Sequence, residues 1–196
     1  MPSLLLASIL AASAPAAAVT TPPSPSASAS AALPSLERRQ ELLFEAAKLG
    51  RADLIPLLVR QGADVNAYEG RGFTPLILAA YNGQAAAVDA LLKAGADPCK
   101  ADRSQGNTAL MGVAFKGDDR IAAMLLRQTC DVDARNNAGQ TALMMAALFN
   151  RTQQVGMLLK AGADPQVIDA AGRSAASVVA AQGNTALAEQ LAAPKR

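Results

Sequence analysis

The strongest constraint on this chain is a motif that recurs at a nearly constant interval. The segment Gly72-Phe73-Thr74-Pro75-Leu76 returns in degraded form as Gly106-Asn107-Thr108-Ala109-Leu110 and as Gly139-Gln140-Thr141-Ala142-Leu143. Its hydroxyl-bearing anchors are spaced 34, 33 and 33 residues apart, at Thr74, Thr108, Thr141 and Ser174. A fixed period of this size indicates stacked supersecondary units rather than one closed core.

Each unit carries signals for two short helices. Thr74 can cap a helix with its hydroxyl, and Pro75 suits the first helical position because its missing N–H costs nothing there. Gly83 and Gly95 tolerate the positive φ with which helices often end. The spacing therefore predicts one helix from Pro75 to Gly83 and a second that ends at Gly95. The polar stretch from there to Gly106 supplies the turn into the next unit.

The pattern Gly-x-Thr-Pro-Leu-x-x-Ala-Ala, then Gly, Val-x-x-Leu-Leu and Gly-Ala-Asp, resembles the ankyrin repeat over about Leu36 to Leu191. The resemblance implies an all-α ankyrin-repeat solenoid of about five stacked helix-turn-helix units with connecting β-turn loops. We predict that this domain covers residues 36–192 and precedes a tail over 193–196. The predicted units, of which the first and last act as caps, are 36–67, 68–101, 102–134, 135–167 and 168–191.

Some positions depart from this family pattern. The His that commonly follows Thr-Pro-Leu is replaced in every unit, by Phe44, Ile77, Met111, Met144 and Ser177. We expect apolar packing in place of its hydrogen bonds. Asn150 stands where the first helix normally ends in Gly, and Asn accepts left-handed geometry. Thr129 replaces the Gly of Gly-Ala-Asp, where a β-branched residue implies strain or a rearrangement.

The first residues of the chain indicate export. Residues 1–18 form a run of apolar and small residues too short to span a bilayer, and Ala16-Ala17-Ala18 suits a signal peptidase. We predict a signal peptide over 1–18 and a Pro/Ser/Ala-rich disordered tether over 19–35. The mature protein would be periplasmic or secreted, with no membrane insertion after cleavage. The alternative is an uncleaved membrane anchor or a disordered Ala-rich leader.

Composition favours binding over catalysis. With 51% hydrophobic residues, 17% charged residues and a net charge of +2, neither nucleic acid nor a membrane surface is indicated as a partner. The chain has no His, the most common catalytic base and metal ligand. Four carboxylates recur with the unit, and we interpret them as acceptors for backbone N–H groups: Asp64, Asp97, Asp131 and Asp164. We predict no enzyme activity, no catalytic residues, no metal and no cofactor.

Two cysteines and several methionines offer alternatives to a purely structural interpretation. Cys99 and Cys130 fall at the same edge of neighbouring units, so an oxidising compartment would permit a disulfide between units. The other possibility is a pair of reduced, buried thiols that act as small hydrophobes. The methionines lie at apolar repeat positions and are interpreted as core filling rather than as copper or redox ligands: Met111, Met124, Met144, Met145 and Met157.

The aromatic residues carry the main functional signal. Ankyrin proteins usually contact partners with the turn tips and the exposed side of the first helix of each unit, and the resemblance implies the same concave surface here. The aromatics that fall on it are Tyr68, Phe73, Tyr81, Phe115 and Phe149. Their predicted neighbours on the protein-binding strip are Arg71, Asn82, Arg103, Gln105, Asn107, Lys116, Arg135, Asn137, Gln140 and Leu148. The alternative is that bulky side chains are only excluded from tight helix packing and so accumulate outside.

We therefore predict a non-enzymatic protein–protein interaction module of the cell envelope. It would be a monomer on its own and would bind a protein partner through the concave face and the turn tips. The rival hypothesis is a periplasmic stress or redox-related protein that uses Cys99 and Cys130 or the methionines. Thiol exposure separates the two, because a reactive thiol is labelled rapidly in the native protein whereas a buried or bridged one is not.

Overall fold

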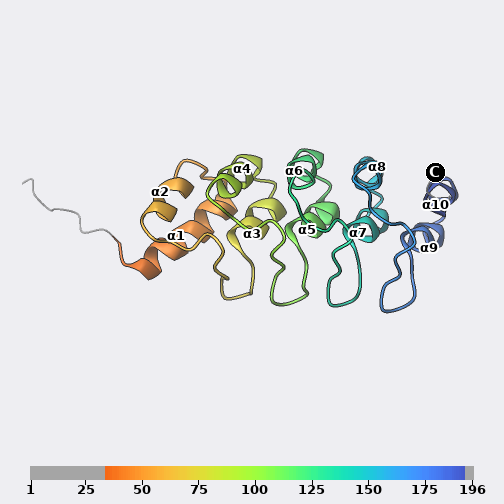
Figure 1. The fold of residues 1–196 in the computed structure, drawn as a ribbon, viewed down its shortest axis with the longest axis horizontal. Coiled ribbons are helices and arrows are strands. Elements are labelled where there is room, and N and C mark those ends of the chain that lie inside the picture. The colour runs from red at the N-terminus through yellow and green to blue at the C-terminus, as the bar shows by residue number, and fades with distance from the viewer. Residues whose placement is uncertain (1–33, 193–196) are drawn as a thin grey trace, which may run out of the picture. The chain divides into compact units, whose positions relative to one another are not determined.

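A computed structural model of the chain describes residues 34–192. The predicted signal peptide over 1–18, the tether up to residue 33 and the tail over 193–196 lie outside the described residues. Within the described range, ten α-helices follow one another in pairs, and the only β-type pairing is an isolated bridge between Ile168 and Ser174. Figure 1 shows the pairs side by side in one row, with long loops projecting from a single side.

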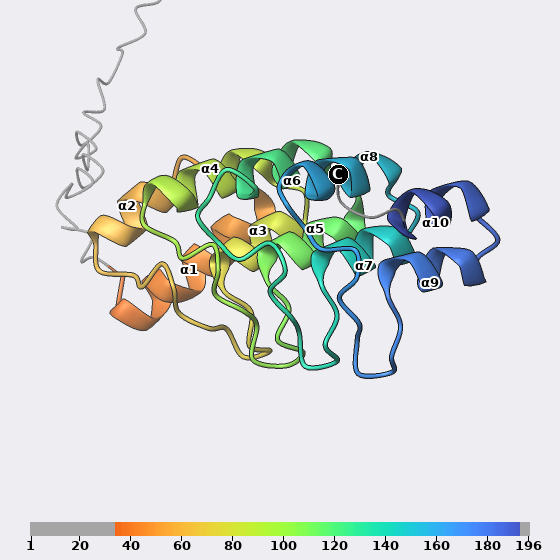
Figure 2. The same ribbon diagram turned by 45° about the vertical axis from the view of Figure 1, so that its right-hand side comes forward.

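The helices form two layers. The inner layer, next to the projecting loops, contains α1 (Leu36–Leu49), α3 (Pro75–Tyr81), α5 (Ala109–Lys116), α7 (Ala142–Leu148) and α9 (Ala175–Ala181). The outer layer contains α2 (Ile55–Arg60), α4 (Ala85–Lys93), α6 (Asp119–Leu125), α8 (Thr152–Lys160) and α10 (Thr185–Ala192). The turned view in Figure 2 shows the same two layers. The predicted all-α solenoid of stacked helix pairs is confirmed.

Hydroxyl caps start the inner helices. The Thr74 hydroxyl accepts the Ile77 N–H at 3.2 Å, and Pro75 occupies the first turn of α3. Thr108, Thr141 and Ser174 cap α5, α7 and α9 in the same way. The first unit lacks the Thr-Pro entry, and Ser35 caps α1 there. The recurring hydroxyl is therefore a start signal for each inner helix.

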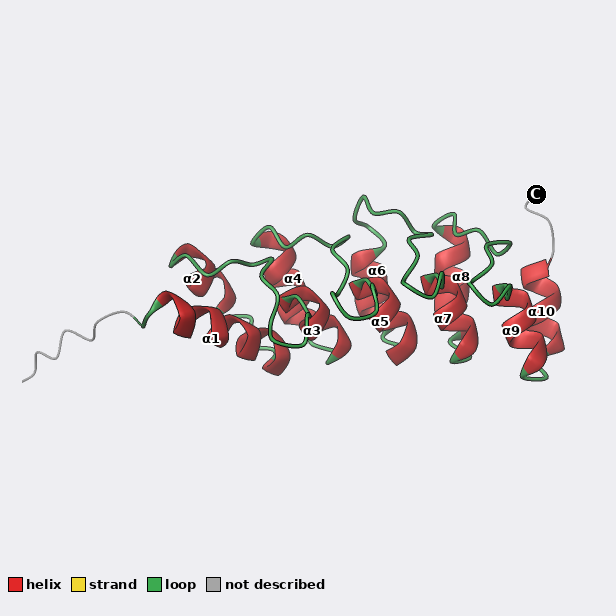
Figure 3. Ribbon diagram, turned by 90° about the horizontal axis from the view of Figure 1, so that it is seen from below, coloured by secondary structure: helices red, strands yellow, loops and turns green. Residues whose placement is uncertain are grey.

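Small side chains let the inner helices pack closely. Ala79 and Ala80 of α3 are fully buried, and Val113 and Ala114 of α5 are at most 1% exposed. Each inner helix packs against the next along the row, and Figure 3 shows these helices lying roughly side by side. Because so little side chain separates them, the backbones can approach and bury the apolar face of every unit.

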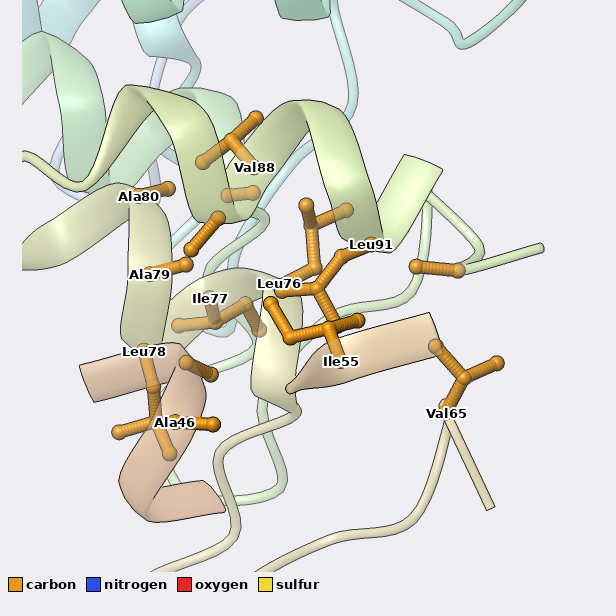
Figure 4. Packing of buried hydrophobic residues seen from close by; sticks show 14 of the residues in the cluster. Ala46, Ile55, Val65, Leu76, Ile77, Leu78, Ala79, Ala80, Val88 and Leu91 are labelled. Carbon is orange, nitrogen blue, oxygen red and sulfur yellow. The ribbon is translucent and has the colours of Figure 1, made fainter. Parts of the chain in front are cut away.

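The core runs through neighbouring units. Figure 4 shows Ile55 of α2, Leu76 of α3 and Leu91 of α4 gathered together, so residues from two units fill one space. Helix α5 links two clusters of buried residues, because Val113 belongs to one and Met111 to the other. The methionines are core filling as predicted: Met111 and Met144 are buried, and Met124, Met145 and Met157 pack against the clusters.

The Gly-Ala-Asp carboxylates shape the turns after the outer helices. Each one accepts a hydrogen bond from the backbone N–H two residues later, at 2.8 or 2.9 Å: Asp64 from Asn66, Asp97 from Cys99, Asp131 from Asp133, and Asp164 from Gln166. This local bond is the acceptor role predicted from their repetition. It gives the backbone the same turn after the outer helix in four units.

A row of cross-unit links joins these turns. The Asn66 side chain accepts the Asp97 N–H at 2.8 Å across 31 residues, and the Asp133 carboxylate accepts the Asp164 N–H at 2.9 Å, also across 31 residues. Between the second and third units the link is covalent, because Cys99 and Cys130 form a disulfide with a Cα–Cα distance of 5.4 Å and a separation of 31 residues. The disulfide therefore replaces a hydrogen bond that both neighbouring junctions use.

The third unit is rearranged at the same place. Asn150 is the only non-glycine residue in the described range with positive φ, at 53°, so Thr129 does not take the left-handed conformation of the glycines it replaces. Helix α6 ends at Leu125, four residues before Thr129, whereas α4 ends at Lys93, two residues before Gly95. Of the two possibilities for Thr129, the structure has the rearrangement, and Asn150 has the predicted left-handed geometry.

Replacing both cysteines tests how much this link stabilises the stack. We expect the Cys99→Ser/Cys130→Ser variant to lose about 3 kcal/mol of unfolding free energy, because the closed loop no longer restricts the unfolded chain. The Cys99→Asn/Cys130→Ala variant carries the residue types of the neighbouring units and should lose about 1 kcal/mol less, since Asn can re-form the hydrogen bond. Urea denaturation without reductant measures both. A serine variant as stable as the parent would contradict the expectation.

Candidate functional site

Four fingers project beside the inner helices. Each is a hairpin-like turn closed by a backbone hydrogen bond, and the four span Glu69–Phe73, Asp102–Asn107, Asn136–Gln140 and Asp169–Arg173. Backbone bonds also join neighbouring fingers, as the Arg103 N–H donates to the Gly72 carbonyl at 3.0 Å. Gly72 has φ of 87°, and a Cβ there would lie 2.9 Å from the Cβ of Arg103, so this close approach requires glycine. The fingers therefore form one connected row.

Asp102 organises the second finger from inside. Its side chain is 5% exposed, and its two carboxylate oxygens accept hydrogen bonds from the N–H groups of Ser104, Gln105, Gly106 and Asn107 and from the Ser104 hydroxyl. Burial alone would raise the pKa of Asp102, but hydrogen bonds from Gln105, Ser104 and Asn107 together lower it. The charged carboxylate is thus the form that holds the finger in place.

A groove of about 440 Å³ lies between the fingers and the inner helices. Its floor includes Leu78 of α3, Gly112 of α5 and Met145 of α7, which occupy the same position in successive helices. Finger residues Asp102 and Asn107 line the opposite side. The groove therefore spans several units, and no single unit could form it.

Aromatic rings make a continuous row beside this groove. The rings of Tyr81 and Phe115 stack with centroids 5.9 Å apart and planes 5° apart. Phe115 meets Phe149 edge to face, with centroids 4.4 Å apart. Tyr81 is 44% exposed, whereas Phe115 and Phe149 are half-buried because each packs on its neighbours. The three rings thus form the aromatic row, a partly exposed apolar surface on α3, α5 and the end of α7.

Basic side chains flank the row and the groove. The Lys116 ammonium lies 4.5 Å from the centroid of the Tyr81 ring, and Lys48 lines the groove at the end of α1. Arg71 lies over the Phe73 ring at 5.3 Å and pairs with Glu69 at 3.4 Å. Both lysines are exposed, so the groove has basic side chains at its edge.

The structure brings together about half of the predicted binding residues. Those that line the groove are Arg71, Phe73, Tyr81, Asn82, Gln105, Asn107 and Phe115. Phe149 and Lys116 adjoin them through the ring contacts. Leu148 and Asn137 are half-buried and exposed, respectively, and neither lines the groove.

Other predicted residues hold the fingers and lie outside the groove. The Tyr68 hydroxyl donates to the Ala101 carbonyl at 3.0 Å, and the Arg103 guanidinium covers the Tyr68 ring at 4.2 Å. Arg135 donates to the backbone carbonyls of Gly139 and Ile168, and the Gln140 amide oxygen accepts from Asn136. Their side chains are engaged within the protein, so we give them a supporting role in finger structure.

The groove also contains residues that the sequence reasoning missed, of which the most important are Lys48, Leu78, Gly112 and Met145. A signal for three of them was present. Leu78 lies three residues before Tyr81, Gly112 three before Phe115 and Met145 four before Phe149, so helical periodicity puts each on the same face as its aromatic neighbour.

Comparison with known proteins agrees with this geometry. The family model described as ankyrin repeats (3 copies) matches residues 27–102 and again residues 98–169. The chain belongs to the ankyrin-repeat family. Ankyrin repeats imply a protein–protein interaction module, and the ankyrin family is generally non-enzymatic.

Individual relatives match over parts of this chain. Ankyrin repeat and SAM domain-containing protein 6 of Rattus norvegicus is 38% identical over 100 residues, which are 50% of this chain and 11% of that protein. Mitochondrial disaggregase of Bos taurus is 45% identical over 56 residues, 29% of this chain and 8% of the relative. Ankyrin repeat domain-containing protein 63 of Homo sapiens is 40% identical over 77 residues, 39% of this chain and 20% of the relative. The chain thus spans a small part of each relative's length.

The described residues have two further properties, which concern metal ions and membranes. Among residues 34–192, no group of three or more His, Cys, Asp or Glu side chains could hold a metal ion. Within the same range, every helix is too short or too polar to cross a membrane.

The role of Asp102 can be tested by pH. We expect Asp102→Ala to lose about 2 kcal/mol of stability at pH 7, because finger N–H groups lose their acceptor. Asp102→Asn should lose only about 1 kcal/mol, since the amide oxygen of Asn136 accepts backbone N–H groups in the third finger in the same way. A lowered folded-state pKa means that the carboxylate's contribution is present above the unfolded pKa of about 3.9 and fades as pH falls through the folded value.

Urea denaturation of the parent and Asp102→Asn between pH 7 and pH 2 measures this. The stability difference should be constant near neutrality and should shrink below about pH 4. Asp169, whose pKa Arg173 lowers, titrates in both proteins and cancels in the difference. A difference that stayed unchanged to pH 2 would show that the charge of Asp102 plays no part.

Proposed function

We propose that this chain is a non-enzymatic module that binds a protein partner through the groove, the aromatic row and the adjoining fingertips. The observation that carries the proposal is the contact of Tyr81, Phe115 and Phe149 in one row beside the groove. Partly exposed aromatic rings remove a large apolar area from water at a small loss of rotamer freedom, which is typical of binding hot spots.

The scaffold beneath the row adds to the argument. Capped inner helices and hydrogen-bonded fingers hold the surface in one shape before a partner arrives. A preorganised surface loses little conformational entropy on association, so more of the contact energy appears as affinity. The partner is expected to be a protein because the groove is lined by residues of several units and because ankyrin repeats imply a protein–protein interaction module.

Truncating the aromatic row is the direct test. We expect Tyr81→Ala/Phe115→Ala/Phe149→Ala to remain folded but to bind its partner at least about thirtyfold more weakly, which corresponds to a loss of about 2 kcal/mol. The ring pairs contribute about 0.5–1.5 kcal/mol each to stability, so thermal unfolding must be recorded alongside. Affinity capture from the native source with the full chain as bait, followed by quantitative mass spectrometry, gives the readout.

A matched control is available on another face. Leu36 is 56% exposed beside Gly62, and Leu57 is 43% exposed on the outer helix α2. Leu36→Ala/Leu57→Ala removes exposed apolar surface outside the aromatic row, and it should retain the same captured proteins as the parent. If the aromatic triple variant also retained them, the binding surface would lie elsewhere.

We also propose export to the periplasm or the exterior of the cell, and a monomer in isolation. Two observations support export: the apolar run over 1–18 and the disulfide between Cys99 and Cys130, a bond that persists in oxidising compartments. In this arrangement the Pro/Ser/Ala-rich residues 19–35 would hold the binding module away from the N-terminus that cleavage leaves.

Export can be measured with a reporter. A fusion of the full chain to alkaline phosphatase, which is active only after export, should show activity in a bacterial host. Deletion of residues 2–18 should abolish it, because the apolar run is the proposed export signal. Equal activity of the two fusions, or none from either, would count against the leader.

The redox alternative has less support. The disulfide stands where neighbouring junctions have a hydrogen bond, and the methionines pack in or against the core. Both features serve the stack itself. Under this interpretation the Cys99→Ser/Cys130→Ser variant binds the partner as the parent does, at temperatures where both are folded.

A further inference from the structure

A glycine interrupts the groove floor at its centre. Gly112 lies inside α5, four residues after its cap, at the position where α3, α7 and α9 carry the apolar side chains of Leu78, Met145 and Val178. Leu78, Gly112 and Met145 all line the groove. The missing side chain leaves a notch between two apolar neighbours, with Tyr81 and Phe115 beside it.

Neither packing nor backbone geometry requires glycine there. Gly112 is absent from the residues with positive φ, and a Cβ would meet only the Tyr81 ring, at the ordinary contact distance of 3.7 Å. Glycine is, after proline, the least favourable residue in a helix interior. The chain thus carries an unfavourable residue where a larger one would fit, at a point that lies on the candidate binding surface.

The charges around the notch are one-sided. In the described part of the chain, neither Lys48 nor Lys116 forms an ion pair, although Arg71 pairs with Glu69. Asp102 is the only carboxylate lining the groove, and its oxygens are occupied by the hydrogen bonds of the second finger. A ligand in the groove would therefore meet two cations without carboxylate partners and no free carboxylate.

We infer that the notch at Gly112 receives a large apolar side chain from an acidic peptide segment of the partner protein. The apolar group would lie against Leu78, Met145 and the Tyr81 ring, and neighbouring Asp or Glu residues would face Lys48 and Lys116. This inference rests on the proposed function, since it specifies the segment that the same groove binds. It also gives a reason for glycine in α5, because a side chain there would occupy the place of the ligand.

The probe is a phage-displayed library of random dodecapeptides, selected on the full chain without reductant. The selected peptides should share a Leu, Met, Phe or Trp flanked by Asp or Glu. A fluorescein-labelled synthetic peptide of the shared sequence then gives affinities by anisotropy. Binding should weaken by about tenfold in Lys48→Glu/Lys116→Glu and should fall as salt rises.

Three glycine variants separate notch filling from stability. Gly112→Met, which copies Met145, should weaken peptide binding by at least about tenfold. Gly112→Ala should raise the midpoint of thermal unfolding by about 2–4 °C and weaken binding by a smaller factor. Gly156 lies inside α8 with nothing within 4 Å of its Cβ position, so Gly156→Ala is the matched control. It should stabilise equally and leave the affinity unchanged.

The outcomes are distinct. Selection of basic peptides, selection of no peptide, or equal binding by the parent and Gly112→Met would overturn the inference. If Gly112→Met bound normally while the aromatic triple variant did not bind, the groove would remain the site and only the notch would be wrong. If both variants bound like the parent, the proposed function would fail as well.

Discussion

Close packing between inner helices is the constraint on which the rest of the molecule depends. A pair such as α3 and α4 is too small to bury its own apolar face, and Leu76 and Leu91 share one buried cluster with Ile55 of the preceding unit. Ala79, Ala80 and Ala114 keep the helices close enough for this to occur. This packing sets the distance between successive units, and therefore the distances between neighbouring fingers and between the rings of the aromatic row.

The fingers translate this spacing into a surface. Backbone bonds such as Arg103 N–H to Gly72 carbonyl connect each finger to the next, and Asp102 holds the second finger from within. The groove therefore has one wall of hydrogen-bonded turns and one floor of helical side chains. Neither wall nor floor belongs to a single unit, so the partner proposed above would contact the stack and not an isolated repeat.

Local chemistry explains which parts of this structure could be predicted. The hydroxyl caps at Thr74 and Thr108 and the acceptor role of Asp97 depend on residues within a few positions of one another, and these predictions are confirmed. For Thr129 the sequence did not decide between backbone strain and a rearranged turn, because the outcome depends on where α6 ends.

The groove was harder to anticipate than the fold, because its lining comes from superposed units. The positions of the aromatic residues identified Tyr81 and Phe115 but not Gly112, which lines the groove between Leu78 and Met145. They also did not show that Arg103 covers the ring of Tyr68. Which side chains share a surface depends on how far one unit is displaced from the next, and no short segment of sequence encodes that displacement. A position without a side chain, such as Gly112, also gives no signal when a sequence is examined for aromatic, charged or metal-binding residues.

The covalent link between Cys99 and Cys130 has a consequence for how the solenoid opens. A linear array with only nearest-neighbour contacts frays from its ends, where each terminal unit has one neighbour. Here the two units tied by sulfur are the second and third, which carry Tyr81 and Phe115. Transient melting of α10 can therefore proceed while the second and third units keep Tyr81 and Phe115 in contact, whereas melting of α1 would displace Lys48 from the groove.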